Sequence, residues 1–362
     1  RAGQGTAPRG GMRILYGANS QGQGHFSKAA VLVPLLEARG HDVRVVSSGP
    51  TPPEGYRFSW HRHFYGLPYA VSDGRTDYGL TIRRWVRDLP KLCGSFAKVR
   101  RLVQEFEPEL ILSDFEPLTA SPLLGARCEV ICISRQVALS DRAISVPDCA
   151  ALDMRLTRTA VRLFTCGADR TYGYHYEPAS FRCVPPVLRP EIFSARPLDG
   201  EHLLVYCHFD DARALIDWAA DRRQPVRAYG FPQVPRGRQG FVEFRPPSRT
   251  GMLDDLRTAR AVVTNAGLTT PIEAFLLGKP VCVTPIRNQW EQVVNAYHLH
   301  EAGLATHCET WDFDRALETP PRSVNHPLLP WLRTAPDAIL DHILDERPAA
   351  TRPATLPFRR AA

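Results

Sequence analysis

The chain has 362 residues, of which 44% are hydrophobic and 23% charged, a composition typical of a globular protein. Lys and Arg number 45 against 38 Asp and Glu, but the basic residues are scattered and do not alternate with aromatic residues as in a nucleic-acid interface. No apolar run approaches the roughly 20 residues of a membrane-spanning helix, and no secretory signal opens the chain. These features favour a cytoplasmic protein without a nucleic-acid partner, with peripheral contact to a membrane left open.

The length suggests more than one domain, because a single hydrophobic core stops growing at roughly 250–300 residues. Residues 1–11 are small and polar and end just before Met12, so we interpret them as an added leader. Residues 347–362 are expected to form a flexible tail. Nine cysteines without a C-x-x-C pair indicate reduced structural residues rather than a zinc site.

The first half of the chain alternates strand-like and helix-like segments. Strands are predicted at 12–17, 41–48, 109–114 and 129–134, and helices at about 27–39, within 81–106 and near Ala120. Short apolar runs separated by helices are typical of βαβ units with a parallel sheet.

A proline-rich stretch without periodicity, residues 175–197, predicts a domain linker. The same alternation resumes beyond it. Strands are predicted at 202–207, 225–230, 241–246, 260–267 and 279–285, and helices near 212–221, at 271–277 and from about 290 and 335. We therefore predict two doubly wound α/β domains, 12–190 and 191–346, which face each other across a cleft at the carboxyl ends of their strands.

The segment G-A-N-S-Q-G-Q-G-H-F-S-K-A, residues 17–29, joins the first strand to the first helix. Its glycines do not follow the G-x-G-x-x-G spacing, and the second strand ends in serines without a ribose-binding acid, so a nicotinamide-dependent enzyme is not favoured. Gly22 and Gly24 permit close approach of a ligand to the backbone. His25 follows them at a strand's carboxyl end, which favours a general base over a structural histidine.

An imidazole serves as a base when a carboxylate on its second nitrogen holds it in the right tautomer. Asp114 is the candidate for this role, because it ends another strand of the same predicted sheet. The alternative role of an aspartate at a strand end is a helix cap.

The second half carries a more specific motif, T-N-A-G-L-T-T-P-I-E-A, residues 264–274. A turn leads from a buried strand into a helix opened by Pro271, where backbone N–H groups and hydroxyls suit a diphosphate. Glu273 can accept hydrogen bonds from two ribose hydroxyls. Glu291 and Gln292 start a later helix and suit the hydroxyls of a sugar.

These motifs resemble the GT-B nucleotide-sugar glycosyltransferases, a superfamily that includes the UDP-glycosyltransferases and the peptidoglycan N-acetylglucosaminyltransferase. The matching strings are G-Q-G-H, R-G-H-D-V and L-S-D-F-E-P in the first half, and residues 264–274, G-K-P and E-Q-V-V-N-A in the second. The resemblance implies two Rossmann-like domains, with the acceptor bound in the first and the donor in the second. It also implies a UDP-sugar as the usual donor, inversion, metal independence, and a terminal helix that returns to the first domain.

By resemblance, His25 is the catalytic base and Asp114 its partner. The expected donor-site residues are Gly22, Gly24, Asn265, Gly267, Leu268, Thr269, Thr270, Glu273, Glu291 and Gln292. The chain departs from the family in two places. Many UDP-glycosyltransferases carry histidine where this chain has Asn265, and the aromatic residue that covers the nucleobase in some relatives has no clear match, residues 244–246 being the nearest region.

The acceptor site is less well defined. Residues 56–79 are rich in aromatic side chains, which either pack over the sheet or stack on an acceptor. The acceptor candidates are Trp60, Phe64, Tyr65, Tyr69 and Arg135. Asp312 and Asp314 repeat the D-x-D spelling of metal sites in the other glycosyltransferase fold, but they follow the donor motifs, and we expect no metal or other cofactor.

The sequence thus predicts an inverting glycosyltransferase that uses a uridine or, second in preference, a thymidine diphosphate sugar. The expected acceptor is a hydroxyl or amine of a small or lipid-linked molecule in specialised-metabolite or envelope synthesis. Two alternatives on the same fold are a sugar-nucleotide 2-epimerase and an inactive homologue that activates a partner enzyme.

Overall fold

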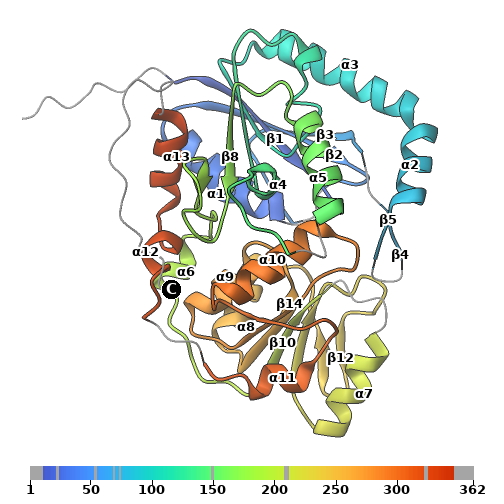
Figure 1. Ribbon diagram of the computed structural model, residues 1–362, viewed down its shortest axis with the longest axis vertical. Helices are drawn as coiled ribbons and strands as arrows, with labels where there is room; N and C mark the ends of the chain where they lie inside the picture. The colour runs from blue at the N-terminus through green and yellow to red at the C-terminus, as the bar shows by residue number, and fades with distance from the viewer. Residues whose placement is uncertain are drawn as a thin grey trace, which may run out of the picture.

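The computed structural model describes residues 11–21, 24–52, 55–67, 70–72, 75–147, 151–207, 212–321 and 325–345. They form two lobes, each built on a seven-stranded sheet flanked by helices. In Figure 1 the upper lobe, blue to green, is the first half of the chain, and the lower lobe, yellow to orange, is the second half. The predicted fold class, two doubly wound α/β units in tandem, is confirmed.

The first sheet is parallel, in the order β3-β2-β1-β6-β7-β8-β9. Its strands are β1 (Arg13–Asn19), β2 (Asp42–Gly49), β3 (His61–Tyr65), β6 (Leu110–Asp114), β7 (Glu129–Ser134), β8 (Arg170–Tyr174) and β9 (Cys183–Val184). The chain order reverses between β1 and β6, and ligands of such sheets bind at this switch point, beyond the carboxyl ends of the strands.

Helices cover both faces of this sheet. They are α1 (Gly24–Ala38), α2 (Tyr78–Arg87), α3 (Leu89–Phe106), α4 (Arg135–Ser140) and α5 (Ala151–Phe164), and a small hairpin, β4 (Ala70–Ser72) and β5 (Arg75–Asp77), precedes α2. The buried side of α1 packs into one core cluster, while that of α3 packs into a second. Gly40, at φ 85°, ends the turn after α1 in the left-handed region that favours glycine.

The second sheet has the order β12-β13-β11-β10-β14-β15-β16, and only the edge pair β12–β13 is antiparallel among its described pairings. Its strands are β10 (Leu203–Tyr206), β11 (Val226–Tyr229), β12 (Gly237–Gln239), β13 (Val242–Phe244), β14 (Ala261–Asn265), β15 (Val281–Thr284) and β16 (Thr306–His307). Its helices are α7 (Ala212–Arg222), α8 (Arg249–Arg257), α9 (Thr270–Leu276), α10 (Trp290–Glu301) and α11 (Phe313–Glu318).

The last helix, α13 (Pro336–Asp345), lies against the first lobe, where Figure 1 shows it in red. Its Ile339, Leu340 and Ile343 are buried in the same core cluster as α1. Arg39, just after α1, forms ion pairs with Asp337 and Asp341 of α13 at 3.1 and 2.9 Å. Two short helices, α6 (Glu191–Ser194) and α12 (Leu329–Leu332), lie on the two crossings between the lobes. The predicted boundary at residue 190 lies between the end of β9 and the start of β10.

Two expectations about the first lobe need correction. The helical stretch within 81–106 is two helices that meet at Asp88, with Pro90 in the first turn of the second. The helix predicted near Ala120 is reduced to one 3₁₀ turn, η1 (Pro122–Leu124). The buried Glu116 carboxylate accepts hydrogen bonds from the backbone of Leu118 and Thr119 at 3.0 and 2.7 Å, as an N-cap does, but Gly125, at φ 65°, ends the turn after three residues.

Several predictions fall on residues outside those that the structure describes. They concern Gly22, Tyr69, most of the expected leader 1–11 and the expected tail 347–362.

Candidate active site

A cavity of about 1460 Å³ lies between the two lobes, at the carboxyl ends of the strands of both sheets. Its first-lobe wall includes Asn19, which ends β1, and His25 of α1. Its second-lobe wall includes Tyr206 at the end of β10 and residues 267–270 after β14. The cavity therefore occupies the predicted cleft and contains candidate residues from both halves of the chain.

His25 and Asp114 meet at the switch point of the first sheet. Asp114 ends β6, the neighbour of β1, and its side chain is fully buried. His25 Nδ1 lies 2.8 Å from Asp114 Oδ1, and the imidazole lines the cavity with 11% of its side chain exposed. A carboxylate at Nδ1 favours the tautomer that carries its proton there and leaves Nε2 able to accept one. The geometry is that of a general base with an orienting acid.

Lys28 is a third member of this cluster, and the sequence analysis missed it. Its ammonium lies 3.1 Å from Asp114 Oδ2 and 4.9 Å from the centre of the Tyr174 ring, and only 3% of the residue is exposed. Lys28 follows His25 by three residues on α1, so both side chains lie on one face of the helix. That spacing is the sequence signal that could have found it.

Two tyrosines complete the surroundings of Asp114. Tyr16 and Tyr174 are fully buried, and their hydroxyls have no hydrogen-bond partner among the described residues. Burial, followed by the charge of Asp114, raises the pKa of both phenols well above the usual value. Both therefore stay neutral, and the net charge of the cluster is set by Asp114, Lys28 and the protonation of His25.

Glu273 is held by an arginine from the linker. It lies on α9, is 3% exposed, and its Oε1 accepts a hydrogen bond from Arg189 Nε at 2.8 Å. Arg189 donates a second bond to the carbonyl of Arg249 at 2.6 Å. Both members of the pair line the cavity. The ion pair keeps the carboxylate in place where the sequence predicts the ribose, and Arg189 is a site residue that the sequence analysis did not name.

The other described donor candidates line the same cavity, Gly24 from the first lobe and the rest from the second. They are Gly24, Asn265, Gly267, Leu268, Thr269, Thr270, Glu291 and Gln292. Asn265 donates to the carbonyl of Thr284 at 3.1 Å, and Gln292 accepts from the backbone of Ile286 at 2.9 Å, so both side chains brace loops of the cleft. Leu268 packs against the cores of both lobes. Their role in donor binding stays a prediction.

Glu291 and Arg135 link the two lobes. Glu291 accepts a hydrogen bond from Gln136 of α4 at 2.7 Å. The neighbouring Arg135 is 1% exposed and reaches Asn295 and His298 of α10 at 2.7 and 2.8 Å, as well as the carbonyl of Tyr174 at 3.1 Å. Arg135 lines the cavity, but all three of its side-chain nitrogens are hydrogen-bonded within this lobe interface. Its contact with an acceptor stays a prediction.

Trp60, Phe64 and Tyr65 do not line the cavity among the residues described, contrary to the acceptor wall that we expected. Trp60 and Phe64 pack against the core cluster beneath α3, on the far face of the sheet. Tyr65 donates to Asp88 at 2.8 Å. For Trp60 and Phe64 the physical reason is strand geometry, because alternate residues along β3 point to opposite faces. His61 and His63, on the other face, both contact the Ser47 hydroxyl, at 2.8 and 2.9 Å.

A different set of apolar side chains lines the first-lobe side of the cavity. It comes from the loops before and after β3, from α2, from the residue after β6 and from α5. Its members are Tyr56, Phe58, Leu67, Tyr78, Ile82, Trp85, Phe115, Val161 and Phe164. Tyr78 also donates to the carbonyl of Asn288 in the second lobe at 2.9 Å, so α2 reaches across the cleft.

The acidic residues at 312 and 314 have structural contacts. Asp312 caps α11 by accepting from Arg315 N at 2.8 Å, and Asp314 pairs with Arg222 at 3.0 Å. Within the described part of the chain, no group of three or more His, Cys, Asp or Glu side chains is placed to hold a metal ion. None of the helices described is long and apolar enough to cross a membrane.

The structure is thus two-lobed, with a His–Asp pair in one lobe and most of the predicted donor residues in the other, on the walls of one cavity. The sequence profile of glycosyl transferase family 1 matches residues 12–319, and the chain belongs to this family of glycosyltransferases. No curated protein matches the chain.

Solved structures of similar fold cover nearly the whole chain. The glycotransferase of kitacinnamycin superposes with a TM-score of 0.55 at 17% identity, over 92% of this chain and 94% of that one. The spinosyn rhamnosyltransferase SpnG gives a TM-score of 0.54 at 15% identity, over 92% of this chain and 96% of that one. The calicheamicin glycosyltransferase CalG4 gives a TM-score of 0.52 at 18% identity, over 92% of this chain and 94% of that one. At such identities the likeness establishes the GT-B fold and nothing finer.

Proposed function

We propose that the protein is an inverting glycosyltransferase that moves a sugar from a nucleoside diphosphate to a hydroxyl of an apolar acceptor. The observation that carries the proposal is the His25–Asp114 contact of 2.8 Å at the wall of a cavity that both lobes share. In a direct displacement, a general base activates the acceptor hydroxyl and a second site holds the nucleoside diphosphate that leaves. The His25–Asp114 pair and the predicted donor wall lie on opposite sides of this cavity and can supply the two.

In this mechanism His25 Nε2 takes the proton of the acceptor hydroxyl as its oxygen attacks the anomeric carbon. The bond between that carbon and the diphosphate breaks, and the nucleoside diphosphate leaves with the electron pair. Attack from the side opposite the leaving group inverts the anomeric centre. Asp114 stabilises the imidazolium that forms, and Lys28 compensates the carboxylate in its buried position.

The character of the acceptor follows from the first-lobe wall. Aromatic and aliphatic side chains from α2, α5 and the loop before β3 dominate it, which favours a rigid apolar aglycone over a sugar or a charged peptide. The structure of SpnG with the spinosyn aglycone, a relative in fold at 15% identity and a TM-score of 0.53, is consistent with this class of acceptor. A specialised metabolite is therefore our preferred acceptor.

The donor is proposed to be a uridine or thymidine diphosphate sugar, bound by residues 265–270 and Glu273 without a metal. The alternatives are a 2-epimerase and an inactive activator. They have less support, because the epimerase needs no apolar acceptor wall and the inactive homologue needs no ordered His–Asp pair.

The test is a donor screen. Purified protein is incubated with UDP- and thymidine diphosphate sugars, with and without a panel of polycyclic and macrolide alcohols, and the released nucleoside diphosphate is measured. The proposal expects release that depends on the acceptor, together with a glycosylated product in the mass spectrum. Interconversion of the donor without an acceptor would identify the epimerase and contradict the proposal.

A further inference from the structure

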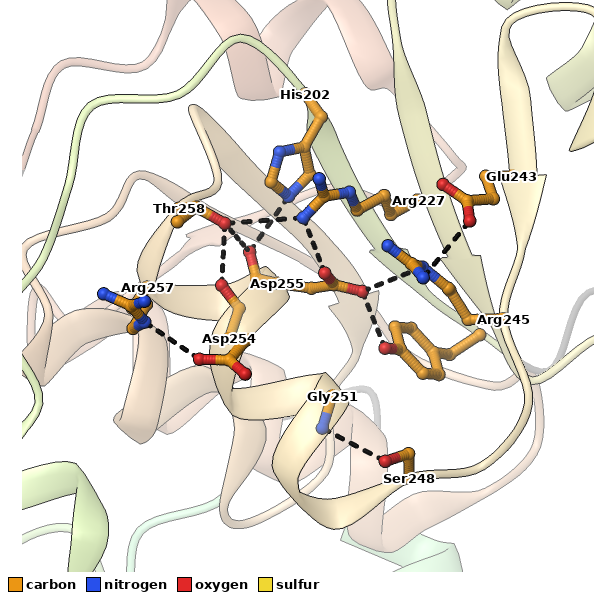
Figure 2. A network of polar contacts seen from close by, with 11 residues as sticks. His202, Arg227, Glu243, Arg245, Ser248, Gly251, Asp254, Asp255, Arg257 and Thr258 are labelled. Atoms are coloured by element: carbon orange, nitrogen blue, oxygen red, sulfur yellow. Dashed lines mark hydrogen bonds and ion pairs between the residues drawn. The ribbon is translucent and has the colours of Figure 1, made fainter.

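A buried carboxylate, Asp255 of α8, organises one end of the cavity wall in the second lobe. The residue is 4% exposed, and three side chains converge on its two oxygens. Arg227 contacts Oδ1 at 2.6 Å, while Tyr229 and Arg245 contact Oδ2 at 2.7 and 3.3 Å. Figure 2 shows this network, with Arg227 and Arg245 approaching Asp255 from different sides.

Arg245 is the member of the network that can reach a ligand. It lines the main cavity together with Tyr229, and 32% of its side chain is exposed. Glu243 holds a terminal nitrogen of the same guanidinium at 3.2 Å. Two carboxylates thus hold the guanidinium of Arg245 through its nitrogens. Contacts in the plane of a guanidinium leave its two faces able to stack on a ring.

The position of Arg245 relative to Glu273 points to the nucleobase. Glu273 is tied through Arg189 to the carbonyl of Arg249, and Arg249 begins α8 only four residues after Arg245. If the diphosphate of the donor binds at residues 267–270 and its ribose at Glu273, the nucleobase lies beyond the ribose, on the side away from the phosphates. The loop from β13 to α8, which carries Arg245, lines the same cavity, and the Arg189 contacts link the end of this loop to Glu273.

The aromatic residues at the end of β13 offer little surface for this role. Phe244 and Phe231 also line the cavity, but they are 3% and 9% exposed and pack against each other in the core of the second lobe, with ring centres 5.4 Å apart. Arg245, the residue after β13, has 32% of its side chain exposed. Its guanidinium is therefore the more exposed planar group at this end of the cavity wall.

We propose that the guanidinium of Arg245, held by Asp255 and Glu243, is the platform on which the pyrimidine of the donor stacks. The inference rests on the proposed function and adds a residue that recognises the nucleobase of the donor. Planar guanidinium groups stack on nucleobases in other proteins, and the positive charge is attracted to the face of the ring.

Arg227 supplies a matched control. It binds the same Asp255, but it lines a separate surface pocket of about 440 Å³ with His202 and Arg257 and is not part of the main cavity wall. Removing Arg227 takes one cation from Asp255, as removing Arg245 does, without changing the surface that faces the donor. Any general effect of disturbing Asp255 should therefore appear in both variants.

The experiment measures the affinity of UDP and of thymidine diphosphate by calorimetry for the full chain and four variants. Arg245→Ala should weaken the binding of the tighter nucleotide about five- to thirtyfold, while Arg227→Ala should leave it within about twofold. Arg245→Trp restores a flat stacking surface and should recover most of the affinity. Arg245→Lys keeps the charge but not the plane and should remain weak. Melting temperatures verify that all four variants are folded.

Three results would overturn the inference. If Arg245→Ala binds the nucleotides with unchanged affinity, the nucleobase does not stack on Arg245. If Arg245→Lys keeps the affinity and Arg245→Trp does not, the residue acts through its charge, for example on a phosphate. An equal loss in Arg227→Ala and Arg245→Ala shows that the effect comes from Asp255. If the unmodified protein bound neither nucleotide, the proposed function itself would fail, and that result is distinct from the other three.

Discussion

Lys28 and Asp114 form a buried ion pair of 3.1 Å on the oxygen that His25 does not use. The carboxylate that orients the base therefore has a permanent positive partner. A buried charge without a partner is strongly destabilising. Lys28 is thus a positioning residue that holds the carboxylate on which the orientation of His25 depends.

The first prediction concerns Lys28→Met. Without the ammonium, the fully buried Asp114 carboxylate loses its ion-pair partner, and removing one partner of a buried pair typically costs about 3–5 kcal/mol of stability. Lys28→Met should therefore unfold at a lower denaturant concentration, and its kcat should fall because the carboxylate that orients His25 is no longer held in place. Lys28→Arg keeps the charge and should recover part of both losses. Normal stability and normal kcat in Lys28→Met would contradict this role.

A second prediction concerns Glu273. Glu273→Ala should weaken binding of the nucleoside diphosphate by about 1–3 kcal/mol, because a charged hydrogen-bond acceptor for the ribose is lost. It should also destabilise the fold, because the half-buried Arg189 loses its ion-pair partner. Calorimetry and thermal denaturation measure the two effects.

The double variant Glu273→Ala/Arg189→Ala separates these effects. Removing the arginine as well should recover part of the stability, since no unpaired cation remains, while nucleotide affinity stays low. If the double variant regained its affinity, the ribose contact assigned to Glu273 would be wrong.

A third prediction concerns acid stability and the lobe interface. Burial, followed by the charge of Arg135, lowers the pKa of His298 to about 4, and the same causes with His298 lower the pKa of His175 to about 2. An unfolded histidine titrates near 6.5. Between about pH 6.5 and pH 4 the unfolded chain therefore binds protons that the folded chain does not, and stability must fall as the pH falls.

The measurement is the free energy of unfolding against pH for the unmodified protein and for His298→Gln. Glutamine can still accept from Arg135 and donate to the carbonyl of Ser145, the hydrogen bonds that the His298 ring makes, but it does not titrate. The slope should be shallower in the variant by at most about 1.4 kcal/mol per pH unit. Parallel curves would show that His298 does not contribute to the acid sensitivity.

A fourth prediction is that turnover survives excess EDTA. The predicted donor wall carries hydroxyls, amide groups and two carboxylates, Glu273 and Glu291, which already accept hydrogen bonds from Arg189 and Gln136. Asp312 and Asp314 are occupied by contacts within the second lobe. Activity that disappears with EDTA and returns with Mn²⁺ or Mg²⁺ would contradict this and point to carboxylates that take up other positions with a donor bound.

The sequence was sufficient for the fold class and for the meeting of His25 with Asp114. Both follow from short-range patterns and one general rule, because alternating apolar runs define parallel strands and the ends of adjacent strands converge. The pairing of strands β1 and β6, which brings the two residues together, is the product of that topology.

The remaining site depended on information that the sequence does not display. Trp60 and Phe64 point into the core and not into the cavity, and the sequence does not show which face of β3 is turned toward the cavity. Arg189 lies in the linker, 84 residues before Glu273, and no local pattern connects the two. Arg135 follows a strand end, as an acceptor-site residue would, and only the packing of α4 against α10 shows its role between the lobes.

The most direct test of the account is the turnover of His25→Ala. General-base catalysis contributes about 10²- to 10⁴-fold, so kcat with a hydroxyl acceptor should fall by that factor while nucleotide affinity is retained. Asp114→Asn should fold and lose a similar or smaller factor, because the imidazole loses the charge that orients it. A His25→Ala protein with nearly normal kcat would contradict the account, because the base would then have to lie elsewhere and the His25–Asp114–Lys28 cluster would serve only the fold.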